Sequence, residues 1–200
     1  MFHVEHRLLT GFAAPQQEGR PATVVFPGPT FVVYRMAALA AGLEVVEAPL
    51  GARFEADEAA LFTAIEGARP NLVFVATPNN PTGTRWPRAT LERMVERFPD
   101  TILVIDEAYA AYAGENHVDL VERGPHVLSL RTYSKVGLAA LLLGVLVGQP
   151  QVIHEVEKVR PPYNLGLLAQ LGGELAIGPF RHELEAHVAE AVGERARLLA

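Results

Sequence analysis

The chain has 200 residues, half of them hydrophobic and a fifth charged, which is the composition of a globular domain and not of a disordered segment. Its formal net charge of −6 argues against a surface that binds nucleic acid, and the absence of cysteine excludes disulfides and thiolate metal sites. The seven histidines have no metal-ligand spacing, so we expect no metal site. Since the N-terminus has no signal-peptide pattern, these features favour a cytoplasmic protein.

Short apolar runs alternate with helical patterns after an irregular lead-in at residues 1–21. The patterns predict, in chain order, a strand at 23–26, a helix at 31–41, a strand at 43–48, a helix at 57–66, a strand at 71–77, a helix at 86–98, strands at 101–105, 127–130 and 144–147, a helix at 151–159 and helical structure from 165 onwards. Gly42 and Gly67 are expected to end the first two helices, and Asp57 is expected to cap the second.

The alternation of strands and helices implies an α/β fold with a mostly parallel sheet covered on both faces, a three-layer α/β/α arrangement. Residues 22–180 would form this domain. Residues 181–200 have helical character and would lead into a further domain. The apolar stretch at 136–148 is too short to span a bilayer, so we expect it in the buried core and predict no membrane contact.

Polar side chains follow three of the predicted strands at the point where each strand ends. The loops after residues 77, 105 and 130 read PNNPTG, DEAY and RTYSK. Because ligands bind outside the carboxyl ends of the strands in parallel sheets, these loops should converge on one crevice. An amide, a carboxylate and an amine would then lie close together.

Four segments point to a family when they are taken together and in order. TPNNPTGT, VIDEAY, LRTYSKVGLAA and VRPPYN, preceded by PGPTFVVY, resemble the fold-type I, class I and II aminotransferases that use pyridoxal phosphate (PLP). They are most similar to the histidinol-phosphate aminotransferase subgroup. The resemblance runs from about Val24 to about Leu168. It implies the PLP-binding large domain of that fold, incomplete at both ends.

The resemblance gives Lys135 and Asp106 the central roles. Lys135 matches the lysine that forms a Schiff base with PLP and then moves a proton as a general base and acid. Asp106 matches the carboxylate that keeps the pyridine nitrogen protonated. The structural alternatives are a solvated surface lysine and an aspartate that caps a helix or forms a salt bridge.

Five further residues match family positions that contact the cofactor. Asn80 and Tyr109 correspond to hydrogen-bond partners of its phenolate oxygen, Thr132 and Ser134 to hydroxyl ligands of its phosphate, and Phe31 to the aromatic ring that stacks on it. Turn formation is the alternative for Asn80, Thr132 and Ser134. Core packing is the alternative for Tyr109 and Phe31.

The sequence departs from the family pattern where phosphate and substrate bind. Leu142 stands where the family has the arginine that clamps the phosphate, and loss of that contact should weaken cofactor binding by about 1.5–3 kcal/mol. Arg131 is close in sequence, but nothing in the sequence shows that it replaces the clamp. The N-terminal phosphate-binding turn and the small C-terminal domain have no counterpart, which leaves Arg160 for the substrate carboxylate. Glu107 is expected to be structural, and Tyr163 and Asn164 are expected to border the site.

Three functions remain open. The first is PLP-dependent transfer of an amino group between an amino acid, either histidinol phosphate or an aromatic one, and 2-oxoglutarate. The second is a catalytically impaired remnant of such an enzyme, and the third is a lyase similar to threonine-phosphate decarboxylase. The resemblance also implies a homodimer whose partners are small amino-acid and keto-acid substrates, and not nucleic acid or membranes.

Overall fold

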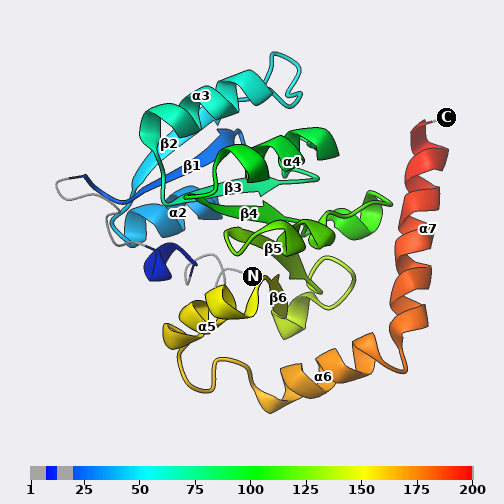
Figure 1. The fold of residues 1–200 in the computed structure, drawn as a ribbon. Coiled ribbons are helices and arrows are strands. Elements are labelled where there is room, and N and C mark those ends of the chain that lie inside the picture. The colour runs from blue at the N-terminus through cyan, green and yellow to red at the C-terminus, as the bar shows by residue number, and fades with distance from the viewer. Residues whose placement is uncertain (1–7, 13–19, 200) are drawn as a thin grey trace.

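The computed structural model of the chain describes residues 8–12 and 20–199. Six strands form one sheet in the order β2-β1-β3-β4-β5-β6 (Figure 1). The strands are β1 (Thr23–Gly28), β2 (Glu44–Pro49), β3 (Leu72–Ala76), β4 (Ile102–Asp106), β5 (Val127–Thr132) and β6 (Gly144–Val147). The pairs from β2 to β5 are parallel, and β6 pairs antiparallel with β5. The prediction of a mostly parallel sheet is confirmed.

Helices cover both faces of this sheet. The labelled α-helices of the chain are α2 (Val33–Ala40), α3 (Glu58–Ala68), α4 (Arg88–Arg97), α5 (Pro150–Lys158), α6 (Leu167–Ile177) and α7 (Arg181–Leu199). Helices α3 and α4 lie on one face and α2 and α5 on the other, while α6 and α7 extend away from the sheet (Figure 1). Three short 3-10 segments lie in the connections: η1 (Ala110–Tyr112), η2 (Val118–Arg123) and η3 (Ala139–Leu141). The three-layer α/β/α prediction is confirmed.

A separate hydrophobic core lies on each face of the sheet. Along β3, Val73 and Val75 point into the core formed with α3 and α4, whereas Leu72 and Phe74 point into the core formed with α2 and α5. Successive side chains of a strand point to opposite faces, so a central strand of a covered sheet is apolar at every position. This packing is the physical reason why the apolar runs of the sequence predicted the strands.

Three predictions concern where α2 and α3 begin or end, and two of them are confirmed. Asp57 caps α3, since its Oδ1 accepts a hydrogen bond from a first-turn N–H, and Gly42 follows α2 with a φ of 78°. The prediction that Gly67 ends α3 is wrong. The helix continues to Ala68, and Arg69 adopts the left-handed conformation, with a φ of 47°, and closes the last turn.

Most of the predicted lead-in lies outside the described residues. Residues 8–11 within it form a helical turn, and Leu8 and Leu9 are fully buried in the core shared with α2 and α5. This part of the segment is therefore not irregular, because two leucines anchor it against the sheet.

The prediction that the apolar stretch at 136–148 is core is wrong. Each of these residues is partly or fully exposed. The stretch contains the connection between β5 and β6 and the strand β6 itself, which lies at the edge of the sheet. An edge strand has no neighbour on one side, so its side chains and its loop stay accessible. Within residues 8–12 and 20–199, no helix is both long and apolar enough to cross a membrane.

Candidate active site

The carboxyl ends of β3, β4 and β5 meet at one edge of the sheet, because Ala76 pairs with Asp106 and Asp106 with Leu130. The loops after these strands enclose an inner recess. Its lining consists of Phe31, Tyr34, Ala76, Pro78, Asn80, Asp106, Ala108, Tyr109 and Lys135. Five of the seven predicted site residues are in this lining, so the expected convergence of the three loops is observed.

Asp106 ends β4 and is 3% exposed. Its Oδ2 accepts a hydrogen bond from the Tyr34 hydroxyl at 2.5 Å, and its Oδ1 accepts one from the backbone N–H of Ala108 at 2.9 Å. Burial raises the pKa of Asp106, and the two donors oppose that rise because they stabilise the ionised form. No basic side chain in the described part of the chain forms a salt bridge with it. A cation placed beside this carboxylate would therefore be stabilised.

Lys135 lies in the loop that connects β5 to β6. Its Nζ is 5.4 Å from the centroid of the Tyr109 ring, within the range of a cation–π contact. The Tyr112 hydroxyl donates a hydrogen bond to the backbone oxygen of Lys135 at 2.5 Å. One tyrosine thus holds the main chain of Lys135, and the other contacts its amine.

The two adjacent asparagines after β3 have different surroundings. Asn79 is buried, donates through Nδ2 to the backbone oxygen of Pro29 at 2.9 Å, and accepts from Thr30 Oγ1 at 2.6 Å. It thereby ties the loop after β3 to the loop after β1. Asn80 is only half-buried and lines the recess. Its amide is therefore available to a ligand.

The two predicted phosphate ligands, Thr132 and Ser134, are not among the residues that line the recess. Thr132 Oγ1 donates to the backbone oxygen of Leu143 at 3.1 Å and accepts from the N–H of Ser134 at 3.1 Å, so it forms part of the turn. Ser134 Oγ is buried and has no hydrogen-bond partner within the described residues. A buried polar atom without a partner calls for an explanation, and a ligand is one.

Leu142, at the position of the family's phosphate arginine, lies at the end of η3. It is 65% exposed, and its φ of 49° is in the left-handed region. Arg131 does not take the place of that arginine here, because its Nε lies 3.7 Å from Oε2 of Glu107, and Arg131 lines a cavity separate from the recess. Glu107 itself is buried and accepts hydrogen bonds from the N–H of His117 and the hydroxyl of Ser129. It has the structural surroundings that we expected.

A larger outer cavity of about 800 Å³ adjoins the recess, with which it shares Pro78, Asn80, Tyr109 and Lys135. The lining side chains nearly fill the recess, which encloses about 10 Å³, so the space for a ligand lies mainly in the outer cavity. Arg85 and Arg195 also line the outer cavity, and no acidic residue of the described chain does. This cavity is thus positively charged in a chain of net charge −6.

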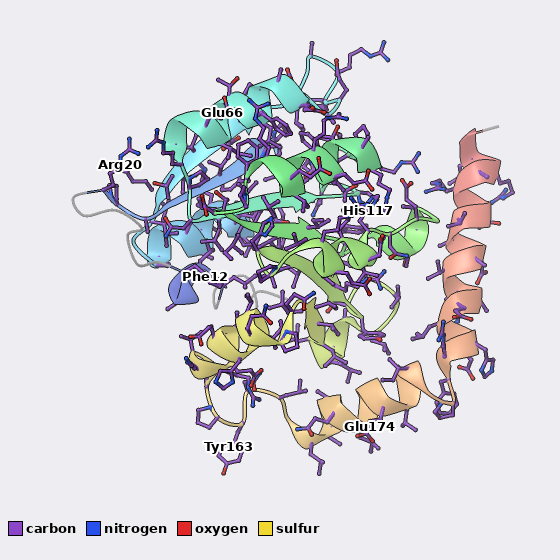
Figure 2. All side chains as sticks on the ribbon, in the orientation of Figure 1. Phe12, Arg20, Glu66, His117, Tyr163 and Glu174 are labelled. Carbon is purple, nitrogen blue, oxygen red and sulfur yellow. The ribbon has the colours of Figure 1, made fainter. Side chains whose placement is uncertain are left out.

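Two residues predicted near the site lie elsewhere. Arg160 is exposed and binds Glu157 at 2.6 Å and Asn164 at 3.0 Å. Tyr163 is 98% exposed and points to solvent from the connection between α5 and α6 (Figure 2). In this structure neither prediction holds, since both residues follow α5, away from the carboxyl edge of the sheet.

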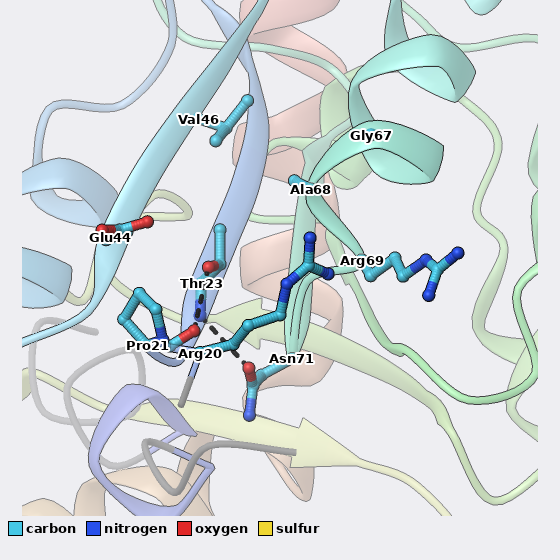
Figure 3. Close-up of a pocket in the computed structure, with 9 residues that line it drawn as sticks. All are labelled: Arg20, Pro21, Thr23, Glu44, Val46, Gly67, Ala68, Arg69 and Asn71. Atoms are coloured by element: carbon cyan, nitrogen blue, oxygen red, sulfur yellow. Dashed lines mark hydrogen bonds between the residues drawn. The ribbon is translucent and has the colours of Figure 1, made fainter. Parts of the chain in front are cut away.

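A further cavity of about 200 Å³ lies at the opposite edge of the sheet, beside the amino ends of β1, β2 and β3 (Figure 3). Asn71 binds the N–H of Thr23 there through Oδ1 at 3.1 Å, and the Thr23 hydroxyl donates to the backbone oxygen of Pro21. These polar groups satisfy one another. Because ligands of parallel α/β sheets bind at the carboxyl edge, the recess and not this cavity is the candidate site.

Three residues of the site were missed by the sequence analysis: Tyr34, Tyr112 and Arg195. Tyr34 and Arg195 belong to helices outside the three strand-end loops. Tyr34 lies three residues after Phe31 within the helix that the sequence predicted at 31–41, and this spacing was a usable signal. No local pattern in the sequence connects Arg195 to the site.

The comparisons with known proteins agree with this fold. Residues 8–199 match the family described as Aminotransferase class I and II. The chain therefore belongs to the class I and II aminotransferases, a family whose cofactor is pyridoxal phosphate.

Curated relatives are histidinol-phosphate aminotransferases. The protein of Methylibium petroleiphilum is 44% identical over 182 residues, which cover 89% of this chain and 48% of the relative. The protein of an Acidovorax species is 45% identical over 153 residues, covering 74% of this chain and 42% of the relative. The chain thus spans about half the length of the curated relatives that it matches.

Solved structures share the fold. The histidinol-phosphate aminotransferase of Sinorhizobium meliloti, solved with pyridoxal-5'-phosphate, has a TM-score of 0.81 and 23% identity and covers 95% of this chain and 52% of its own. A mutant aspartate aminotransferase of Thermus thermophilus has a TM-score of 0.83 and 24% identity and covers 98% of this chain and 55% of its own. The fold-type I architecture expected from the sequence is therefore confirmed.

Proposed function

We propose that this chain carries the cofactor site of a PLP-dependent aminotransferase that acts on histidinol phosphate or a related amino acid, with 2-oxoglutarate as acceptor. The observation that carries the proposal is that Lys135, Asp106, Asn80, Tyr109 and Phe31 line one recess. The names of the curated relatives support the amino donor. They do not favour the decarboxylase alternative, although an L-threonine-O-3-phosphate decarboxylase has the same fold, with a TM-score of 0.71.

The residues present fit PLP by their chemistry. Asp106 would hold the protonated ring nitrogen, Asn80 and Tyr109 the phenolate oxygen, and Phe31 the face of the ring. The unpartnered Ser134 hydroxyl suits a phosphate oxygen. Bound PLP supplies an aldehyde that bonds to an amine and a ring that accepts electrons.

Lys135 contributes the amine and moves the proton. The contact of its Nζ with the Tyr109 ring places it inside the recess, and the Tyr112 hydroxyl fixes its main chain. Lys135 would take the proton from the substrate Cα and return it, as a general base and acid. The Tyr34 hydroxyl and the Ala108 N–H would favour the ionised form of Asp106, against the rise in its pKa that burial causes.

The outer cavity suits an anionic amino acid. Arg195 donates to the backbone oxygen of Tyr112 at 3.3 Å and forms no ion pair with a described residue, so its charge is available. Arg85 is paired with Glu115 at 3.2 Å, on the surface. A guanidinium binds carboxylate and phosphate with two parallel hydrogen bonds. Arg195 therefore replaces Arg160 as the candidate for the anionic group of the substrate.

A single-turnover experiment tests the proposal. The chain is loaded with PLP, freed of excess cofactor and mixed with histidinol phosphate without a keto acid. We expect about one equivalent of keto product, none with Lys135→Ala, and weaker substrate saturation with Arg195→Ala. Release of carbon dioxide without keto product would favour a lyase, and no product from a chain that binds PLP would favour the remnant.

Assembly and location complete the proposal. The chain is proposed to act as a cytoplasmic homodimer, as the resemblance implies. Sedimentation equilibrium of the chain with and without PLP measures the assembly directly, and a monomer under both conditions would contradict it.

A further inference from the structure

Tyr34 is the most deeply buried polar side chain beside the candidate site, and the sequence analysis gave it no role. It lies on α2, is fully buried, and reaches Asp106 across 72 positions of the sequence. Its hydroxyl points at the carboxylate that the proposed function assigns to the ring nitrogen of the cofactor. The packing of its ring and the state of Asp106 decide what this contact does.

The ring of Tyr34 is held on three sides by aromatic neighbours. It stacks on Phe74 with centroids 4.7 Å apart, meets Phe31 edge-on at 5.7 Å, and contacts Phe26 at 5.9 Å. Aromatic contacts of this kind fix a ring in one orientation. Its hydroxyl is therefore aimed at Asp106 Oδ2 before any ligand arrives, and little freedom is left to lose on binding.

Asp106 needs such a donor because it is buried. The titratable groups around it are Tyr34 from α2, Tyr109 and Lys135 from the loops that line the recess, and Glu107, whose negative charge raises the pKa of Asp106. Its neighbour Glu107 is directed to the other face of the sheet, where it accepts a hydrogen bond from Ser129. With Oδ2 bound to Tyr34 and Oδ1 to the Ala108 N–H, the carboxyl group is fixed in position, and both donors favour its ionised form.

We propose that Tyr34 is a positioning residue of the cofactor site, which acts through Asp106 by holding its carboxylate in the orientation that receives a cationic ring nitrogen. This inference rests on the proposed function, because it assigns a role to Tyr34 only if Asp106 binds the cofactor. Phe31, which precedes α2, also contacts the Tyr34 ring. The segment around α2 would thus supply both the stacking ring and the support of the carboxylate.

The test is a double-mutant cycle with PLP as the probe. Tyr34→Phe keeps the ring and removes the hydroxyl, and it is made in the wild-type chain and in Asp106→Asn. We expect Tyr34→Phe to weaken PLP binding about 3- to 10-fold in the wild-type chain, the scale of one hydrogen bond, and to have no effect in Asp106→Asn. The acid limb of the PLP affinity profile should also move to higher pH, since the lost donor favoured the ionised carboxylate.

Tyr133→Phe is the matched control, because Tyr133 follows β5 and lines cavities other than the two of the site. It should leave PLP affinity unchanged. Equal weakening by Tyr34→Phe in both backgrounds, with an unmoved pH profile, would mean a purely structural role and overturn the inference. Unchanged affinity in a folded Tyr34→Phe chain would also overturn it, while the proposed function would stand. A wild-type chain that binds no PLP would overturn both.

Discussion

The recess around Asp106 and the loop between β5 and β6 adjoin the same cavity, but different interactions hold them in place. The recess is built from side chains of the core: Asp106 ends a buried strand and Tyr34 is packed among aromatic rings. The loop is held by backbone hydrogen bonds, such as that from the Tyr133 N–H to the Leu143 oxygen, and Gly137 within it has a φ of 103°.

The difference indicates how strongly each region can bind a ligand. A group fixed by packing is preorganised, whereas an exposed loop must be ordered on binding. The side chains of the recess would contact the ring of a cofactor seated in the adjoining outer cavity, and the loop would bind its phosphate, with Leu142 where an arginine is expected. We therefore expect most of the cofactor affinity to come from the ring side.

The largest expected effect is that of Asp106→Asn. It removes the charge that faces the ring nitrogen, and we expect PLP affinity to fall about 10- to 100-fold, the scale of a hydrogen bond to a charged group. Fluorescence titration measures this. Glu107→Gln is the matched control on the next residue: it should lower the free energy of unfolding by about 1–3 kcal/mol and leave PLP affinity nearly unchanged.

The same Asp106→Asn chain also tests the pH dependence of stability. Since burial raises the pKa of Asp106, the empty folded chain holds a proton more tightly than the unfolded chain does. The tighter proton binding stabilises the folded chain below pH 3.8, the ordinary pKa of an aspartate. This stabilisation is lost as the pH rises through the higher pKa of the folded state. Without PLP, Asp106→Asn should be more stable than the wild type at pH 7 in urea unfolding. A less stable variant would mean that Asp106 serves the fold and not the site.

Leu142→Arg tests whether the loop between β5 and β6 binds the phosphate weakly because it lacks a cation. If this is the case, the added guanidinium should tighten PLP binding about 10-fold. Pyridoxal, which has no phosphate, separates the possibilities: its affinity should not change. Equal gains for both compounds would mean that the substitution acts on the loop itself.

Ser134→Ala should have a smaller effect. Because Ser134 Oγ has no partner among the described residues, its removal should leave the free energy of unfolding unchanged or slightly raised. PLP affinity should fall about 2- to 10-fold if this hydroxyl binds the phosphate. A loss of stability with no loss of affinity would contradict the proposed role.

The smallest effect is expected far from both regions, in the contact between α3 and α4. Hydrogen bonds from Arg93 and Thr90 lower the pKa of Glu58 from 4.5 to about 2. The stabilisation is present above pH 4.5 and is lost as pH falls towards 2. Glu58→Gln should remove this acid dependence and cost at most about 1 kcal/mol at pH 7, since the pair is exposed. Its PLP affinity should not change.

The strand ends could be predicted from sequence because they follow local rules. Apolar runs such as Leu72–Ala76 report a strand buried on both faces, and the parallel register then brings Asn80, Asp106 and Lys135 together. The alternation of side chains also separates Asp106, the last residue of β4, from Glu107, which follows it and faces the opposite side of the sheet.

The rest could not be predicted because it depends on contacts between distant segments. The apolar stretch at 136–148 has the composition of core, yet it becomes an exposed loop and edge strand. Short 3-10 segments such as Ala110–Tyr112 have no helical periodicity to detect. Arg195 comes to the outer cavity only because α7 contacts η1.

Covalent labelling tests the central claim most directly. The chain is saturated with PLP, reduced with borohydride and digested, and the modified peptides are identified by mass spectrometry. We predict one reduced pyridoxyl group per chain, on Lys135, and its loss in Lys135→Arg while Lys158, the other lysine, stays unlabelled. Labelling mainly on Lys158, or no pyridoxyl group on Lys135 at saturating PLP, would contradict the account.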